Sequence, residues 1–273
     1  MKILQTIDEL KTFRATLKGP VGLVPTMGAL HNGHLSLIQQ SCNENEHTIV
    51  SIFVNPTQFL AGEDFEKYPK KTEADIKICE LCGVEALFMP DVQTMYTSLE
   101  PSILAPSSKS YILEGLARPG HFDGVLQVVL KLFHLSKPHR AYFGKKDAQQ
   151  LYLIQNMVQT LFLDVQIIPC EIVREDDGLA LSSRNVYLSN EQRSEALLIS
   201  KSLKTATRAI IAGTRDIATI KHEMLLTLEP LHVEYVEILR RDFDTIETID
   251  LGNTIILVCA KVGTTRLIDN LWI

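Results

Sequence analysis

Short, continuous apolar or β-branched runs recur through roughly the first 170 residues of the chain. They lie at 21–24, 48–54, 84–89, 140–143 and 165–169. Runs without polar alternation are typical of strands buried on both faces of a parallel sheet. Helical periodicity fills the intervals, at 34–46, 72–82, 123–136 and 147–161. This alternation predicts an α/β domain with a Rossmann-like, doubly wound parallel sheet.

The pattern changes after the charged segment 174–178. Two helices are predicted next, with no strand between them, followed by two strands and a hairpin. They span about 190–212, 215–229, 232–240, 254–260 and 260–268. We therefore predict a Rossmann-like domain over residues 1–174 and a smaller α+β domain over 175–273. Asp123, Ser189 and Thr214 are expected to cap their helices, because their side-chain oxygens accept from first-turn N–H groups.

Net charge, apolar content and cysteine count argue against several classes of protein. The 273 residues carry a formal net charge of −6, so bulk attraction to nucleic acid or to an anionic membrane is not expected. No apolar stretch approaches the length of a membrane span. Five cysteines, an odd number, argue against a disulfide framework and predict a reducing cytoplasm. We interpret the C-x-x-C of Cys79 and Cys82 as two small buried residues of a helix, because no second pair completes a zinc site.

Polar segments follow three of the predicted strands. Residues 25–34 read Pro-Thr-Met-Gly-Ala-Leu-His-Asn-Gly-His, residues 55–59 read Asn-Pro-Thr-Gln-Phe, and residues 144–150 read Gly-Lys-Lys-Asp-Ala-Gln-Gln. Open parallel sheets bind their ligands just beyond the carboxyl ends of the strands. We therefore expect the three segments to meet at one edge of the sheet and to carry the chemistry.

The first segment differs from two well-known nucleotide loops. G-x-x-x-x-G-K-[ST] would need Lys and Ser or Thr where His34 and Leu35 stand, and G-x-G-x-x-G is absent. What remains is a helix that opens with His31, Gly33 and His34, at the end that has partial positive charge and unsatisfied N–H groups. Imidazoles there donate to phosphate oxygens, and the glycine lets a ligand approach the backbone. We predict a nucleotide site; the alternative is that one histidine caps and the other packs.

H-x-G-H after a strand resembles the signature of the nucleotidyltransferase superfamily, which includes class I aminoacyl-tRNA synthetases. The longer phrase at 25–34 resembles the pantothenate synthetase family in particular. Four further segments share that resemblance, at 53–59, 118–125, 142–151 and 178–185. The resemblance covers nearly the whole chain and is weakest in roughly the last 80 residues. One position departs from the family pattern, since Lys145 stands where the family usually has Glu.

The resemblance implies ATP-dependent joining of (R)-pantoate and β-alanine to give pantothenate, AMP and diphosphate. The pantoate carboxylate would attack the α-phosphate of ATP, and the amine of β-alanine would then attack the acyl adenylate. Charge builds up on the transferring phosphoryl group, so catalysis would rest on positioning and charge stabilisation. The family also implies Mg2+ bridged by ATP phosphates and a cytoplasmic homodimer, with the smaller domain as a lid.

The resemblance also assigns roles to single residues. His34, as proton donor, would be catalytic together with His31, Lys146 and Arg184. Gln58, Gln150 and Arg118 would bind pantoate or β-alanine, because amides suit hydroxyls and carboxylates and arginine suits a carboxylate. The ATP site would comprise Met27, Gly28, Ala29, Leu30, His31, Asn32, Gly33, His34, Gly144, Lys145, Lys146, Asp147, Val173, Leu181, Ser182, Ser183 and Arg184. Asp147 is the one candidate protein ligand for Mg2+.

Two other functions stay open at this point. A nucleotidyltransferase that leaves AMP on its product would share the nucleotide motif, although the neutral Gln58 and Gln150 argue against a phosphorylated acceptor. A non-enzymatic nucleotide-binding protein would share the fold. Against it, the two histidines together with Lys146 and Arg184 exceed what binding alone requires.

Overall fold

The computed structural model describes residues 1–273, which divide into two compact units. Unit 1 comprises Met1–Lys145 and Gln149–Glu171, and unit 2 comprises Lys146–Ala148 and Ile172–Ile273. Residues 146–148 thus belong to unit 2 although their neighbours on both sides in the sequence belong to unit 1. None of the helices combines the length and the apolar character that a membrane crossing needs.

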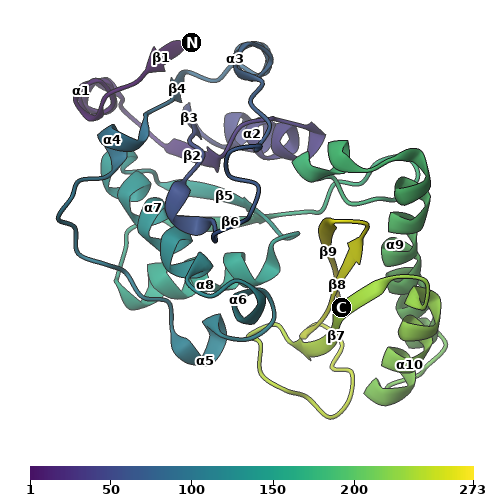
Figure 1. The fold of residues 1–273 in the computed structure, drawn as a ribbon. Coiled ribbons are helices and arrows are strands. Elements are labelled where there is room, and N and C mark those ends of the chain that lie inside the picture. Colours follow the sequence, from purple (N-terminus) through teal and green to yellow (C-terminus); the bar gives the residue numbers. More distant parts are fainter. The chain divides into compact units, whose positions relative to one another are not determined.

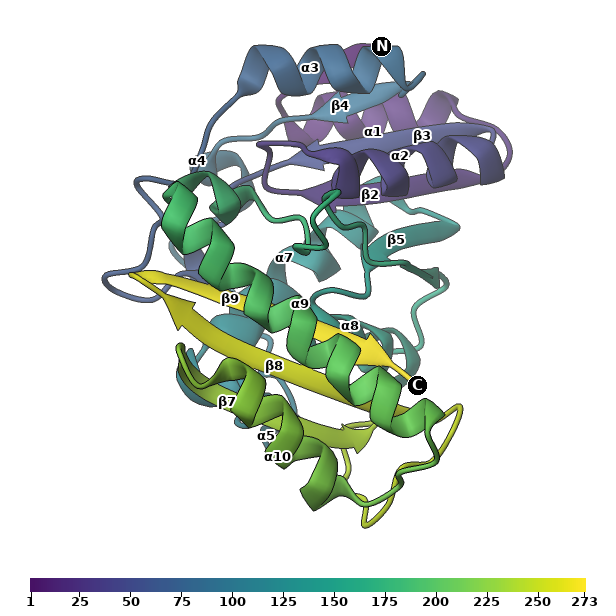
Figure 2. The ribbon, with the colours of Figure 1, turned by 90° about the vertical axis from the view of Figure 1, so that its right-hand side faces the viewer.

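Unit 1 is built on a six-stranded parallel sheet in the order β1-β4-β3-β2-β5-β6 (Figure 1). The strands are β1 (Lys2–Leu4), β2 (Val21–Thr26), β3 (His47–Ile52), β4 (Ala86–Phe88), β5 (Arg140–Gly144) and β6 (Gln166–Cys170). The helices are α1 (Ile7–Thr16), α2 (Asn32–Glu44), η1 (Pro56–Gln58), α3 (Thr72–Leu81), α4 (Val92–Met95), α5 (Ser107–Ser110), α6 (Glu114–Ala117), α7 (His121–Ser136) and α8 (Ala148–Thr160). Helices α2 and α7 lie on opposite sides of the sheet (Figures 1 and 2), which confirms the doubly wound fold.

One core of unit 1 lies between the sheet and helices α2 and α3. Ile38 of α2 and Cys79 of α3 are fully buried against strand residues such as Val50. All five cysteines are free, and burial raises the pKa of the Cys79 thiol to about 12. Cys79 therefore behaves as a small apolar residue, as predicted, and Cys82 at the end of the same helix is half-buried.

The direction of winding reverses beside β2. From β2 the chain runs through α2 to β3 and through α3 to β4, and it then returns through α7 to β5 on the other side of β2. Strands β2 and β5 pair only at Gly22 with Arg140 and at Leu23 with Ala141, so their carboxyl halves are not paired with each other. Open sheets bind ligands at such a switch point.

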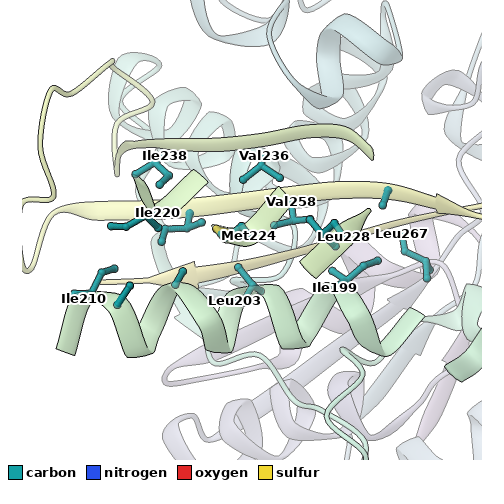
Figure 3. Packing of buried hydrophobic residues seen from close by; sticks show 14 of the residues in the cluster. Ile199, Leu203, Ile210, Ile220, Met224, Leu228, Val236, Ile238, Val258 and Leu267 are labelled. Carbon is teal, nitrogen blue, oxygen red and sulfur yellow. The ribbon is translucent and has the colours of Figure 1, made fainter. Parts of the chain in front are cut away.

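Unit 2 contains a three-stranded antiparallel sheet, β7 (His232–Arg240), β8 (Thr254–Val262) and β9 (Thr265–Trp272). Two helices, α9 (Asn190–Ile211) and α10 (Ile217–Leu228), cover one face of it (Figure 2). Figure 3 shows their apolar side chains, among them Leu203 and Met224, packed against strand residues such as Val258. The hairpin predicted to turn near Gly263 is present, since Val262 pairs with Thr265.

Two elements at the start of the chain were not predicted, and two of the predicted helix caps are wrong. Strand β1 and helix α1 precede the first predicted strand, and the three residues of β1 are too short a run to show a pattern. Helix α7 begins at His121 after the left-handed Gly120, and Asp123 accepts the Ala105 N–H instead of capping. Asp216, not Thr214, caps α10, because its carboxylate accepts from Thr219 N–H and suits the helix dipole. Ser189 caps α9 as predicted.

His47 at the start of β3 contacts the Glu85 carboxylate, and this hydrogen bond raises the pKa of His47. The folded state therefore favours the protonated ring. The contribution of His47 to folding stability is complete below about pH 6.5, the pKa of the ring in the unfolded chain, and it is lost as pH rises through the raised pKa of the folded state. The two side chains are 21% and 41% exposed. Solvent screening at that exposure limits the effect to below about 1 kcal/mol. We expect His47→Gln to lower the thermal midpoint slightly at pH 6 and not at pH 9; an equal loss at both values would contradict this.

Candidate functional site

A buried carboxylate of α3 holds the loop that follows β2. Asp75 is 2% exposed, and its oxygens accept the backbone N–H groups of Ala29 at 2.9 Å and Leu30 at 2.8 Å. Gly28 and Ala29 have φ values of +84° and +49°. For a residue with a Cβ this left-handed conformation costs about 1–2 kcal/mol. Gly28 adopts this conformation without that cost, so the hydrogen bonds to Asp75 offset the strain at Ala29.

The two predicted histidines lie where this loop enters α2. His31 is the N-cap, and its Nδ1 accepts the Gly33 N–H at 3.1 Å. Because that amide only donates, the proton of the neutral His31 ring is on Nε2. The His34 ring lies next to it, with centroids 4.0 Å apart. Both imidazoles are thus at the positive end of the α2 dipole, where anions are stabilised.

Gln58, predicted to bind substrate, contacts the same loop. Its Nε2 donates to Met27 Sδ at 3.2 Å, and its Oε1 accepts from Asn55 Nδ2 at 3.1 Å. Asn55 is 1% exposed; its Nδ2 also donates to the Gly124 carbonyl and its Oδ1 accepts the Tyr96 hydroxyl at 2.7 Å. The direction of the Gln58 amide is therefore set by its neighbours. A thioether is a weak acceptor, so an oxygen of a ligand would be a better partner for Nε2.

Arg118 lies close to η1 but already has a carboxylate partner. Its Nε and Nη2 donate to the two oxygens of Glu63 at 2.6 and 2.8 Å, and its Nη1 lies 3.0 Å from His121 Nε2. Glu63 thus occupies the bidentate fork that we expected for a substrate carboxylate. The substrate contact of Arg118 stays a prediction, and its observed partners belong to the chain itself.

The remaining predicted residues of unit 1 lie near the end of β5. Gly144 is the last residue of the strand, and Gln150 lies in the first turn of α8. The Lys145 ammonium contacts the Glu171 carboxylate, and the Lys145 N–H donates to the Cys170 carbonyl. The lysine that departs from the family pattern thus has an acidic partner one residue after the neighbouring strand β6.

The other predicted residues belong to unit 2. Lys146 lies 3.8 Å from Asp147, and its carbonyl accepts from Asn270 Nδ2 at 2.7 Å. The Leu181 N–H donates to the Val173 carbonyl at 3.1 Å, so these two predicted ATP-site residues are adjacent. Ser182 caps η2 (Ser183–Tyr187), and its Oγ accepts the Arg184 N–H at 3.3 Å.

A polar network supports the η2 turn. Glu175 accepts from Asn185 Nδ2 at 3.0 Å and from Arg193 at 2.7 Å. Arg174 holds the buried Asp269 with both of its terminal nitrogens, at 2.5 and 2.9 Å. The backbone that carries Ser182, Ser183 and Arg184 is therefore anchored to α9 and to β9.

The predicted Mg2+ ligand Asp147 is not part of a larger cluster of metal-binding side chains. No group of three or more His, Cys, Asp or Glu residues is arranged to hold a metal ion. The side chain of Asp147, the one candidate ligand for Mg2+, is 52% exposed and has Lys146 beside it.

Sequence reasoning missed several residues that shape the site. Asp75 lies on the same helical face as the buried Cys79, four residues away, and a carboxylate on an apolar face was its only signal. Asn55 and His121 stand in motifs that were noticed, but no role was given to them. Glu63 lies in a polar stretch without any local signal.

We expect Asp75→Asn to destabilise unit 1 by about 2 kcal/mol, because hydrogen bonds to a charged acceptor are worth about 1.5–3 kcal/mol. The amide has one acceptor oxygen, and its NH2 group would face one of the two loop N–H donors. Thermal unfolding measures the change, with Glu73→Gln on the exposed face of the same helix as the charge-matched control. If both variants melt at the wild-type temperature, Asp75 does not stabilise the loop.

A family model, related sequences and solved structures all match this chain to the same family. The family model described as pantoate-beta-alanine ligase matches residues 2–272. A pantothenate synthetase of Campylobacter curvus is 61% identical over 273 residues, which is 100% of both chains. The crystal structure of pantothenate synthetase from Thermus thermophilus superposes with a TM-score of 0.95 at 38% identity, covering 100% of this chain and 99% of that one. The pantoate-beta-alanine ligase of Francisella tularensis, complexed with beta-gamma ATP and beta-alanine, has a TM-score of 0.84 at 35% identity, with 100% and 97% covered.

Proposed function

Because this chain belongs to the pantoate-beta-alanine ligase family, we propose that it joins (R)-pantoate and β-alanine through a pantoyl adenylate, using ATP and releasing AMP and diphosphate. The observation that carries the proposal is the contact between Gln58 and Met27. It joins a neutral amide suited to pantoate to the loop that leads into a helix N-terminus suited to phosphate. A carboxylate bound at this amide and a nucleotide bound at the helix would be neighbours.

In the first step the pantoate carboxylate attacks the α-phosphate of ATP and diphosphate leaves. The α2 N-terminus, with His31 donating from Nε2 and His34 as proton donor, stabilises the charge that develops on the phosphate oxygens. Lys146 neutralises the α-phosphate, and Arg184 with Ser182 and Ser183 binds the departing phosphates. Gln58 and Gln150 hold the pantoate hydroxyls and carboxylate.

In the second step the amine of β-alanine attacks the acyl carbon of the adenylate, and AMP leaves. The mixed anhydride would also react with water, so its site must exclude water. The nine-tenths buried Gln58 and the nearly inaccessible Asn55 supply a dry, polar wall for the intermediate. Mg2+ would enter bound to the ATP phosphates, with Asp147 as its one candidate protein ligand.

The test is isotope exchange between diphosphate and ATP. We expect exchange that requires (R)-pantoate and does not require β-alanine, and free AMP once β-alanine is added. Exchange without pantoate, or an adenylated end product, would indicate a nucleotidyltransferase of another kind. ATP binding without exchange would indicate a protein that only binds nucleotide. Light scattering tests the homodimer that we also propose, and the proposed cytoplasmic location is tested by fractionation of the cells.

A further inference from the structure

The η1 turn, which contains Gln58, packs against the first turn of α7 and is hydrogen-bonded to it. Asn55 Nδ2 donates to the Gly124 carbonyl at 3.0 Å, and His121 Nδ1 lies 2.7 Å from the Gln58 carbonyl. A Cβ on Gly124 would lie 2.3 Å from the Thr57 carbonyl oxygen, a distance that packed atoms do not adopt. The two backbones are therefore in direct contact, with no side chain between them.

The chemistry of its neighbours fixes the tautomer of His121. The arginine side chain only donates, so His121 Nε2 accepts from Arg118 Nη1. A carbonyl only accepts, so His121 Nδ1 carries the proton and donates to Gln58. His121 is 7% exposed, and burial together with the Arg118 charge lowers its pKa to about 4. The ring is neutral at pH 7 and keeps this tautomer.

Arg118 itself is held by the bidentate Glu63 contact. From there the contacts reach the Gln58 carbonyl in two ways, through His121 at 2.7 Å and directly from Arg118 Nη2 at 3.3 Å. We infer that His121 and Arg118 are positioning residues, which fix the Gln58 backbone so that its amide points toward the bound pantoate. This inference rests on the function proposed above. The chain of contacts ends on the backbone of Gln58, whereas Asn55 and Met27 hold its side chain.

Two amide variants separate the two ends of the His121 ring. In His121→Asn the side-chain NH2 takes the place of Nδ1 and still donates to the Gln58 carbonyl. In His121→Gln the amide reaches the place of Nε2 and meets Arg118, so the Gln58 carbonyl loses its 2.7 Å donor and keeps only Arg118 Nη2 at 3.3 Å. We expect His121→Gln to raise the KM for pantoate about tenfold, the scale of one lost positioned hydrogen bond, and to leave the KM for ATP within about twofold. His121→Asn should restore most of the pantoate affinity.

The experiment measures pantoate-dependent exchange and thermal midpoints for both variants and the wild type. His134→Gln, on the exposed last turn of the same helix, is the control for a histidine change in α7. If the KM for pantoate is unchanged in His121→Gln, or if both variants raise it equally, the inference is wrong. Lower midpoints with unchanged KM values would assign a purely structural role and would also overturn it. An inactive wild type would overturn the proposed function itself.

Discussion

Replacing Lys146 with alanine should slow pantoate-dependent exchange by about 10²–10³-fold, the loss typical of one preorganised charge-stabilising donor. The ammonium is proposed to neutralise charge on the α-phosphate, and alanine has no charged group to take its place. The KM for pantoate should change little, because the neutral glutamines are proposed to bind that substrate. Single-turnover measurements of adenylate formation report the step directly.

The adjacent lysine gives a matched control. Lys145→Ala removes the same charge one residue earlier, but Lys145 contacts Glu171 and belongs to unit 1. Lys145 is itself a predicted ATP-site residue, so we expect this variant to raise the KM for ATP but to lose far less of the maximal exchange rate than Lys146→Ala. Equal losses in both variants would mean that the general positive charge of the segment, not the Lys146 ammonium, supports the reaction.

His34→Ala should also slow adenylate formation by about 10²–10³-fold, because it removes a donor from the helix N-terminus that faces the proposed phosphate site. The substitution also removes the ring that packs on His31 at 4.0 Å. Two further variants separate these effects. His34→Phe keeps an aromatic ring and cannot donate, whereas His34→Gln keeps an N–H donor without a ring.

We expect the phenylalanine variant to be as slow as the alanine variant and the glutamine variant to recover part of the rate. Recovery in His34→Phe would assign His34 a packing role beside His31 and would remove it from the chemistry. A thermal midpoint and a circular dichroism spectrum like those of the wild type show that each variant keeps the overall fold. Quenched-flow measurement of adenylate compares the three variants.

The parts of the fold that depend on local patterns were predictable. The buried strands β2 and β3 read as continuous apolar runs, and the Ser189 capping box has a local signature. The placement of His31 and His34 at a helix start followed from the same kind of local reading. Strand β1 was not predicted because three residues are too few to show a periodicity. Asp216 was not predicted as a cap because Thr214, two residues earlier, is also a residue type found at N-caps, although Asp is the stronger cap.

The contacts that shape the site were not predictable, because they join residues far apart in the sequence. Asp75 accepts from Ala29 and Leu30, more than 40 positions away, and Arg118 meets Glu63 at a similar separation. From the sequence alone, an arginine before Pro-Gly could equally well bind a substrate or lie exposed on the surface. The fold shows that Arg118 contacts Glu63. The catalytic roles of the predicted residues stay predictions, which the variants above test.

Because Asp75 holds the β2–α2 loop, a change outside the loop can alter its conformation. The shape of the loop is maintained by α3, a helix that carries no predicted site residue. A substitution that changes the packing of α3 against the sheet, for example at the fully buried Cys79, would move Asp75 away from the N–H groups of Ala29 and Leu30. If the loop binds ATP as proposed, such a variant would weaken ATP binding in assays, although the altered residue lies in the core and not in the loop.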